Sequence, residues 1–311
     1  MNVTLAIASG KGGTGKTTVA LNLAAVADQP VRLLDCDVEA PNDHLFIKPG
    51  QVQERVSSVM IPEFDQELCD GCGRCKQHCR FNAIAVLGGK PMLFPELCHS
   101  CGACLPVCPH GAISEVQRPI GVVRSGTKDH IALVYGVLNI GEAKSPPLIG
   151  DVRSEPGVVD GAMDGGMVGA GAGAGASAGA GASASTGLTI IDAPPGTSCP
   201  VVAAVKHSDY LLLVTEPTPF GLNDLKLTVD TLKQLGKPYG VIVNRAELGN
   251  KEVYQYLEQK GIPLLMEIPM DREIARIYCE GLLLVDEKPE YQRLFIDLLH
   301  RITHLNKIIK K

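Results

Sequence analysis

The chain has 311 residues, of which 45% are hydrophobic and 20% charged, and its net charge at pH 7 is −5. This length can bury one large core together with a smaller module, whereas the acidic balance argues against general nucleic-acid binding, which needs a basic face. No apolar run approaches the ~20 residues that cross a bilayer. The apolar start of the chain also lacks the shape of a signal peptide, so we expect a cytoplasmic protein.

A glycine-rich segment, ASGKGGTGKTTVALNLA, follows an apolar strand at the start of the chain (residues 8–24). It matches the phosphate-binding pattern G-x-x-x-x-G-K-[ST], and the helical spacing after it supplies the strand–loop–helix context that this pattern requires. Its glycines let backbone N–H groups turn around a polyphosphate, and the helix adds its positive N-terminal end. We expect Lys16 to bridge the terminal phosphates and Thr17 to offer its hydroxyl to Mg²⁺. The predicted nucleotide-binding residues of this segment are Gly10, Lys11, Gly12, Gly13, Thr14, Gly15, Lys16, Thr17 and Thr18.

Three acidic residues follow or end two further apolar strands. VRLLDCDVEAPN contains Asp35 and Asp37, and LTIIDAPPGTSCP contains Asp192. In open α/β sheets the ligand binds at the carboxyl ends of the strands, so we expect all three carboxylates near the phosphates. A helix N-cap is the common alternative for a single strand-end aspartate, but three such acids around one glycine loop argue against coincidence.

Eight of the eleven cysteines fall between residues 69 and 108, in two stretches that repeat one pattern. CDGCGRCKQHCRFNAI and CHSCGACLPVCPHGAI both read C-x-x-C-G-x-C-x-x-x-C-x-x-x-A-I. This is the bacterial ferredoxin pattern, in which three close cysteines bind one iron–sulfur cluster and the fourth binds the other. It predicts two [4Fe–4S] clusters, the first held by Cys69, Cys72, Cys75 and Cys108, and the second by Cys79, Cys98, Cys101 and Cys104.

Other uses of the cysteines fit the pattern less well. Structural zinc usually takes two C-x-x-C pairs separated by a longer loop, and disulfides rarely persist in a reducing compartment. Cys199 follows Asp192 by seven residues, and we expect a small packed residue there rather than a ligand of a third cluster shared between subunits. Cys36 and Cys279 have no predicted role.

The second half of the chain alternates predicted strands and helices, with one exception. Residues 151–187 are rich in glycine, alanine and serine, which cannot bury enough apolar surface to offset the entropy of ordering, so we expect a flexible loop, with a silk-like β stack as the alternative. The last predicted helix has a basic end. It either packs on the sheet or contacts a membrane surface. Its apolar stripe is predicted to run through Leu294, Leu298, Ile302, Leu305 and Ile309.

Lys11 gives the glycine loop the form GKGGTGKTT, which resembles the deviant phosphate-binding loop of the MinD/ParA/nitrogenase-iron-protein family of ATPases. The resemblance implies a doubly wound, mostly parallel α/β sheet that binds ATP and Mg²⁺. It also implies a homodimer in the ATP state, in which Lys11 reaches the partner subunit's nucleotide while Lys16 serves its own.

The same resemblance assigns roles to residues beyond the loop. Asp37 is similar to the aspartate that positions the attacking water, Asp35 to an outer magnesium partner, and Asp192 to the Walker B aspartate. Lys11, Lys16 and Asp37 would then be the catalytic residues. Asn244 and the turn from Pro269 to Asp271 would lie near the adenine base.

The layout resembles a branch of that family with an inserted ferredoxin domain, as does the segment NIGEAKSPPL (residues 139–148). It implies an ATPase domain over residues 1–59 and 118–311 and an inserted α+β ferredoxin-like domain over 60–117. The implied function is an ATPase coupled to iron–sulfur clusters, for ATP-gated electron transfer or metallocofactor assembly with a redox or assembly protein as partner. Two alternatives stay open: a MinD-like spatial organiser with redox-sensing clusters, and a ferredoxin whose other domain only binds nucleotide.

Overall fold

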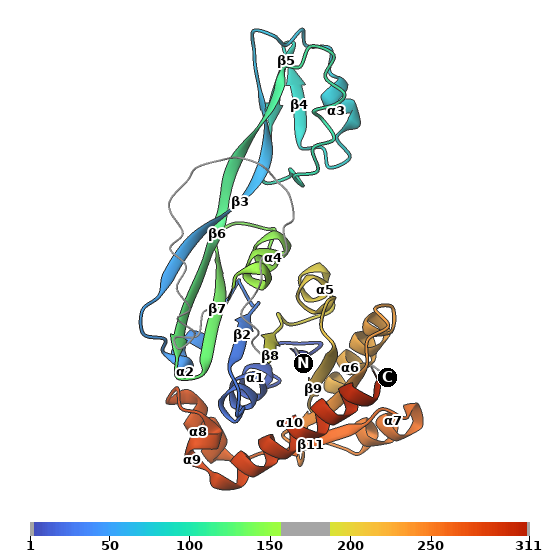
Figure 1. Cartoon of the computed structure of the whole chain (residues 1–311). Helices are drawn as coiled ribbons and strands as arrows, with labels where there is room; N and C mark the ends of the chain where they lie inside the picture. Colours follow the sequence, from blue (N-terminus) through green and yellow to red (C-terminus); the bar gives the residue numbers. More distant parts are fainter. Residues whose placement is uncertain (1–2, 157–186, 310–311) are drawn as a thin grey trace.

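The computed structural model describes residues 3–156 and 187–309, which form a large sheet covered by helices and a small module at the end of a long ribbon (Figure 1). The strand order is β11-β10-β9-β1-β8-β2-β7-β6-β3. All pairs from β11 to β7 are parallel, and β6 and β3 are antiparallel additions at one edge. The expected mostly parallel α/β sheet is therefore confirmed. The strands are β1 (Val3–Ala8), β2 (Val31–Asp35), β3 (Gln53–Phe64), β6 (Ile113–Lys128), β7 (Ile131–Leu138), β8 (Leu188–Asp192), β9 (Tyr210–Thr215), β10 (Tyr239–Asn244) and β11 (Leu264–Ile268).

Both faces of the parallel sheet are apolar, because each is covered by helices. Strand β9 is buried along its whole length, as parallel strands between two helical layers usually are. Leu5 and Ile7 of β1 join one hydrophobic cluster, whereas Ala6 and Ala8 join the other. The first face is covered by α1 (Lys16–Ala25), α2 (Asp43–Ile47), α8 (Arg272–Cys279), α9 (Leu284–Glu287) and α10 (Pro289–Ile309). The second is covered by α4 (Pro146–Ser154), α5 (Cys199–Val205), α6 (Pro219–Lys233) and α7 (Glu252–Lys260).

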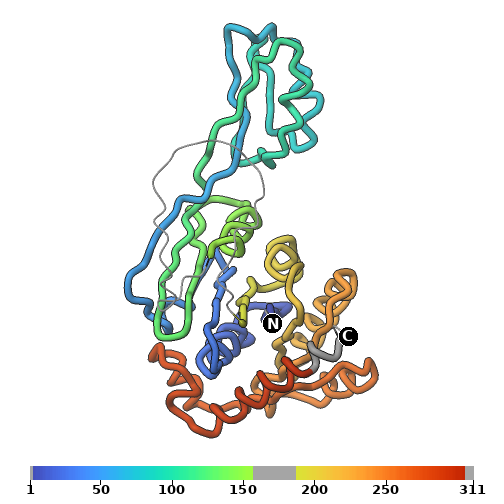
Figure 2. The backbone as a smooth tube through the Cα atoms, viewed as in Figure 1, coloured from blue at the N-terminus to red at the C-terminus, as the bar shows by residue number. Residues whose placement is uncertain are grey.

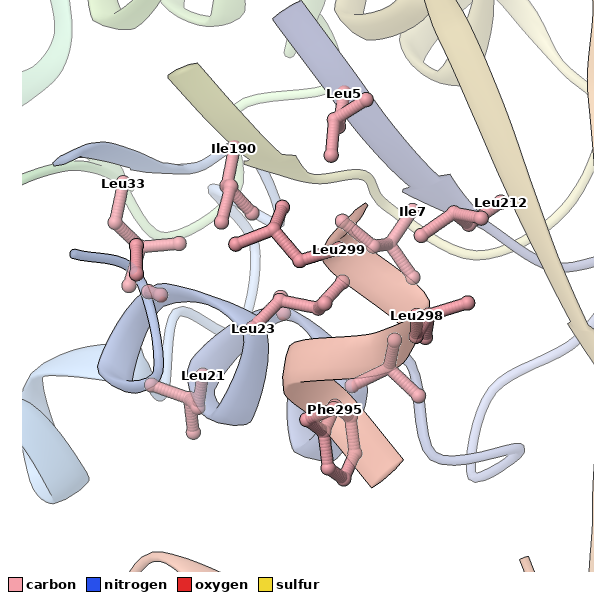
Figure 3. Close-up of a cluster of buried hydrophobic side chains, with 14 of the residues drawn as sticks. Leu5, Ile7, Leu21, Leu23, Leu33, Ile190, Leu212, Phe295, Leu298 and Leu299 are labelled. Carbon is pink, nitrogen blue, oxygen red and sulfur yellow. The ribbon is translucent and has the colours of Figure 1, made fainter. Parts of the chain in front are cut away.

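The C-terminal helix α10 packs on the sheet through part of the predicted stripe, since Leu298 and Ile302 are buried. Phe295, Leu298 and Leu299 point into the first hydrophobic cluster, beside α1 (Figure 3). Leu294 is 45% exposed, so the predicted stripe is wrong at that position. The buried face of the helix is wider than the predicted stripe and rotated relative to it, because the sheet below accepts neighbouring residues such as Leu298 and Leu299. The side chains of the predicted residues 305 and 309 lie outside the described ones. No helix in the described part of the chain is long and apolar enough to cross a membrane.

Helix α4 corrects the predicted start of the glycine- and alanine-rich loop. We expected the loop to begin at residue 151, but the helix continues to Ser154. Leu148, Ile149 and Val152 are fully buried in the second hydrophobic cluster. This apolar spacing holds the helix together past the point where the composition changes. Residues 157–186, the rest of the predicted loop, lie outside the described part of the chain.

The cysteines lie in a separate module, at the far end of a ribbon formed by β3 and β6 (Figures 1 and 2). The two strands pair from Gln53↔Ser125 to Phe64↔Ile113, whereas β6 pairs with β7 only as far as Gly121. The ribbon therefore projects beyond the sheet by about eight residues, or roughly 25 Å. We call residues 65–112 the cysteine module; it contains α3 (Arg74–His78), β4 (Ile84–Leu87) and β5 (Lys90–Leu93). The predicted boundaries at 60 and 117 fall inside the ribbon, close to the directly paired Met60 and Gln117.

Candidate functional site

The predicted phosphate loop lies between β1 and α1, at the carboxyl edge of the parallel sheet. Gly15 is the N-cap of α1, and its φ of 98° is in the left-handed region that favours glycine. A Cβ on Gly15 would collide with the side-chain amide of Asn244, which donates a hydrogen bond to the Thr14 carbonyl over 2.8 Å. The structure thus joins the end of β10 directly to the glycine loop.

Lys16 and Thr17 lie near Asp192, one of the acids predicted to surround the phosphates. The Lys16 ammonium donates to the Ser9 hydroxyl over 3.1 Å, and burial lowers the pKa of Lys16, against the opposing effect of Asp192 and Asp37. The Thr17 hydroxyl donates to Oδ2 of Asp192 over 2.6 Å. Oδ1 of Asp192 is buried and has no partner among the described residues. A hydroxyl and a carboxylate so arranged fit Mg²⁺, which takes oxygen ligands.

Asp35 has a different environment from the other acids. It lies opposite Asp192 in the sheet register, and its carboxylate accepts backbone N–H groups from residues 37, 42 and 43. These bonds shape the loop that follows β2. Burial, followed by repulsion from Asp192, raises the pKa of Asp35 to about 8. Asp37 is half-buried beside this site, and burial raises its pKa while Lys16 opposes the rise.

Asp43 was not predicted, yet it is fully buried next to these acids. Both of its carboxylate oxygens lack a partner among the described residues, and burial, then Asp35, raises its pKa well above the usual range. No motif identifies it, because it follows β2 by eight residues and is brought close only by the loop that Asp35 shapes.

Lys11 forms an ion pair within its own chain. Its ammonium lies 2.9 Å from Oε2 of Glu216, which is buried and also paired with Arg245. Glu216 follows β9 and was not predicted, because a lone glutamate after a strand carries no motif. In this single chain, therefore, Lys11 is held beside its own sheet.

The remaining predicted nucleotide residues lie at the same edge of the sheet. Pro269 and Asp271 follow β11, one strand beyond Asn244 in the sheet order. Asp271 is the N-cap of α8 and accepts the Glu273 N–H over 2.8 Å. Its contact with adenine stays a prediction, since the capping contact by itself explains the residue.

The eight module cysteines line two separate cavities, in the sets that the ferredoxin pattern predicts. Neither cavity contains a cysteine of the other set. The first, about 370 Å³ up to its opening, is lined by Cys69, Cys72, Cys75 and Cys108. The second, about 390 Å³, is lined by Cys79, Cys98, Cys101 and Cys104. The second also contacts Met60 and Pro62 of the ribbon, whereas the first contacts Phe64 at its tip, so the second lies nearer the sheet.

The sequence repeat of the module is also a backbone repeat. The N–H of Ala83 donates to Sγ of Cys79, and the N–H of Ala112 donates to Sγ of Cys108, both over 3.3 Å. Equivalent positions of the two stretches share a left-handed backbone even where one of them is not glycine. The pairs, each with its two φ values, are Gly71 and Ser100 (74° and 53°), Gly73 and Gly102 (72° and 66°), and Asn82 and Gly111 (53° and 61°).

The cysteine sets fit a cluster better than a single ion. A four-cysteine zinc site brings all four sulfurs within about 2.3 Å of one point. Among the described residues, however, no three histidine, cysteine or acidic side chains converge closely enough to hold one metal ion. Four thiolates around an open cavity, with N–H groups directed at sulfur, are the donor set of a [4Fe–4S] cluster.

The three other cysteines lie away from these cavities. Cys36 is buried beneath the acids, and burial raises the pKa of its thiol. Cys279 is exposed at the end of α8. Cys199, the first residue of α5, is exposed, so our prediction of a packed residue there was wrong. The N-terminal position of Cys199 on α5 leaves its side chain outside the core.

Comparison with known proteins agrees with the nucleotide site. A family model for the CobQ/CobB/MinD/ParA nucleotide binding domain matches residues 5–285. The chain belongs to this family. Two uncharacterized proteins of Methanocaldococcus jannaschii resemble most of the chain. One is 28% identical over 302 residues, covering 96% of this chain and 95% of the relative, and the other is 27% identical over 287 residues, covering 89% of each.

Further similarities cover part of the chain or concern the fold alone. An iron–sulfur cluster carrier protein of Rickettsia bellii is 32% identical over 101 residues, which is 31% of this chain and 32% of that protein. The septum site-determining protein MinD of Pyrococcus horikoshii, solved with Mg-ADP, has a TM-score of 0.56 at 21% identity and covers 99% of this chain and 98% of its own. The cell division ATPase MinD of Pyrococcus furiosus has a TM-score of 0.56 at 20% identity, with 98% and 100% covered. These two structures share the fold.

Proposed function

We propose that this protein is a homodimeric, Mg²⁺-dependent ATPase coupled to two [4Fe–4S] clusters, with ATP-gated electron transfer as its output, either to a redox partner or in metallocofactor assembly. The observation that carries the proposal is the pair of cysteine-lined cavities on a ribbon whose strands belong to the same sheet as the glycine loop. A nucleotide site and a redox site built on one sheet can influence each other mechanically.

On the nucleotide side, the chain supplies positioning and charge, as phosphoryl transfer requires. Lys16 faces the terminal phosphates from within the loop, and the Thr17–Asp192 pair holds Mg²⁺. Asp37, half-buried and near Lys16, orients the attacking water. Lys11 must leave Glu216 to reach the partner's nucleotide, so dimerisation and release of this ion pair go together.

On the cluster side, the chain provides thiolates, N–H donors and partial shielding from water. When bound, the clusters supply one-electron redox chemistry. Each cavity has a complete set of four cysteines, which favours retention of the clusters over their donation to another protein. Each set has one exposed cysteine, Cys72 or Cys101, but the second set is the more shielded, because Cys98 and Cys104 are buried and no cysteine of the first set is.

The cluster half of the proposal is tested by iron and acid-labile sulfide analysis of protein purified without oxygen. We expect two clusters per chain and paramagnetic resonance spectra of the reduced protein that change when Mg-ATP is added. Zinc in place of iron and sulfide would refute this half. Spectra that ignore nucleotide would refute the coupling.

The ATPase half is tested by complementation. Lys11→Ala and Asp37→Ala should each lower the hydrolysis rate by about 10²-fold or more, because each removes a group that acts on the transition state. A heterodimer of the two variants keeps one complete site, so an equal mixture should recover about one quarter of the wild-type rate in a symmetric dimer. Failure to recover would show that Lys11 does not act across the interface. Lys206→Ala, an exposed lysine after α5, is the control that should leave the rate unchanged.

A further inference from the structure

The loop between β7 and α4, residues 139–145, contacts three parts of the molecule: the segment after Asp37, the ribbon and the cysteine module. We propose that this loop transmits the state of the nucleotide site to the second cysteine set, and that Lys144 is the positioning residue that makes the last contact. The proposal rests on the proposed function. It names the element that couples the nucleotide site to the clusters, which the proposed function leaves open.

The nucleotide end of the loop is attached to the segment that follows Asp37. The N–H of Leu138 donates to the Val38 carbonyl over 2.9 Å, and the Ser145 hydroxyl donates to Oε1 of Glu39 over 3.3 Å. Ser145 is buried, so losing this acceptor is costly unless another replaces it. A shift of Asp37 around a bound nucleotide would therefore carry Glu39 and the Ser145 end of the loop with it.

The middle of the loop is fixed to the ribbon. The N–H of Asn139 donates to the Ile120 carbonyl over 2.9 Å. The Glu142 side chain is 4% exposed and pairs with Arg118 of β6 over 2.7 Å, while its second oxygen accepts the N–H of Lys144 over 3.1 Å. These contacts make the loop a defined structure in which the two ends move together.

Lys144, the residue next to Ser145, contacts the second cysteine set. The Lys144 ammonium donates to the backbone carbonyl of Cys98, and it lies 3.5 Å from the Pro95 carbonyl. Cys98 is the buried first member of the second set, which is the set nearer the sheet. Lys144 thus connects the nucleotide segment with a cluster ligand, and its positive charge beside that ligand favours the reduced cluster.

The first experiment measures amide hydrogen exchange over residues 95–105, with and without Mg²⁺ and a non-hydrolysable ATP analogue. In the wild type, nucleotide should change exchange in this segment, and Lys144→Met should abolish the change. Lys144→Arg, which keeps a cationic donor, should retain part of it. Lys90→Met, at an exposed lysine of the same module, should retain all of it. A wild type without any nucleotide effect on this segment, or a Lys144→Met variant that keeps it, would overturn the proposal.

The second experiment separates transmission from simple charge. Lys144→Met removes both the contact and the charge, so it should lower the midpoint potential of one cluster and abolish its dependence on nucleotide. Ser145→Ala breaks the contact with Glu39 on the nucleotide side, so it should abolish the dependence while leaving the potential near that of the wild type. Coupling is reciprocal. Oxidation state should therefore change nucleotide affinity by about fivefold or more in the wild type, the low end of measured couplings, and by a factor near one in both variants.

These outcomes are distinct from failure of the proposed function. Iron and sulfide analysis and the hydrolysis rate decide whether the protein is a cluster-containing ATPase. If both hold and Ser145→Ala still leaves the potential sensitive to nucleotide, the loop is not the coupling element.

Discussion

The sheet and the cysteine module belong to one chain and are joined by two strands, β3 and β6, but they differ in what holds each of them together. The sheet has a hydrophobic cluster on each face, built from side chains such as Leu5, Leu33 and Phe295. The buried residues of the module are few and mostly small: Ala83, Ile84, Pro91, Cys98, Cys104 and Ala112. Several of its large apolar side chains are exposed instead, among them Leu68, Leu87, Phe94 and Leu97.

This contrast predicts that the cysteine module depends on the proposed clusters for its fold, whereas the sheet does not. A segment as short as the module rarely folds on apolar burial alone, and metal binding to a preformed ligand set contributes folding free energy. Two of the buried residues in the module are themselves predicted cluster ligands. The sheet has its own proposed cation site, the buried acids beside the glycine loop, but the two hydrophobic clusters hold its fold together.

The largest expected effect therefore comes from removing iron and sulfide with a chelator and an oxidant. Residues 65–112 should lose their amide protection, whereas β1 and β9 should keep theirs. Cys101→Ser should produce a milder form of the same loss, and Cys279→Ser, which replaces an exposed cysteine outside the module, should not. If the metal-free module kept its amide protection, its own packing would be enough to hold its fold. The proposed difference between the module and the sheet would then be refuted.

The second-largest effect is expected in the apolar core of the sheet. Leu298→Ala should lower the free energy of unfolding by about 2–5 kcal/mol, because it leaves a cavity beneath α10. Leu294→Ala, four residues earlier on the same helix but 45% exposed, should change it by less than about 0.5 kcal/mol. Urea denaturation followed by circular dichroism measures both. Equal losses would mean that the two faces of α10 are packed alike.

A smaller effect concerns the acids of the sheet. In the nucleotide-free protein, burial first, with the other groups around each acid contributing, raises the pKa of Asp35 to about 8 and that of Asp192 to about 6. The folded state then binds more protons than the unfolded state, in which aspartate titrates near 3.9. The free energy of unfolding should accordingly fall as pH rises from about 4 to about 8, by up to about 1.4 kcal/mol per pH unit for each excess proton.

Thermal denaturation across this pH range measures the slope. Asp35→Asn should flatten it, because it removes the titrating carboxyl while its one amide oxygen can still accept the N–H groups of residues 42 and 43. Mg-ATP should flatten it in the wild type by neutralising the acids. A slope that persists in the variant would assign the titration to other groups. The stability of the cysteine module should not depend on pH in this way, because these acids lie in the sheet.

The smallest effect is expected at the ion pair of Lys11. Glu216→Gln removes the contact that holds Lys11 in its own chain, and partly exposed pairs of this kind are worth up to about 1 kcal/mol, or a factor of about five in an equilibrium. Nucleotide-dependent self-association, followed by sedimentation, should become several-fold tighter. Arg245→Gln removes the other partner of Glu216 and leaves the Lys11 pair, so it should show no gain. Equal association of the two variants would contradict this role.

The grouping of residues at both candidate sites was predictable because it resides in short stretches of sequence. The glycine loop and the strands before Asp35 and Asp192 follow from local spacing, and the sheet brings the Thr17 hydroxyl to Asp192. The cysteine repeat likewise led to the two sets that line the two cavities. Neighbouring residues in the sequence suffice for such patterns, because the motif carries its own geometry.

Contacts between distant segments were not predictable in this way. The length of the β3–β6 ribbon, the burial of Asp43 and the pairing of Glu216 with Lys11 depend on which strands are adjacent in the sheet. The predicted stripe of α10 held at Leu298 and Ile302 but was wrong at Leu294 for the same reason, since a helix alone does not show which side its neighbours cover.

The sequence by itself therefore determined the family, the phosphate loop and the ligand sets, all of which are encoded by residue type and spacing. Only the tertiary structure decided that the 139–145 loop lies between the nucleotide site and Cys98. That placement results from strand order and burial over many residues, and the free energies involved are distributed across the whole sheet rather than carried by any local pattern.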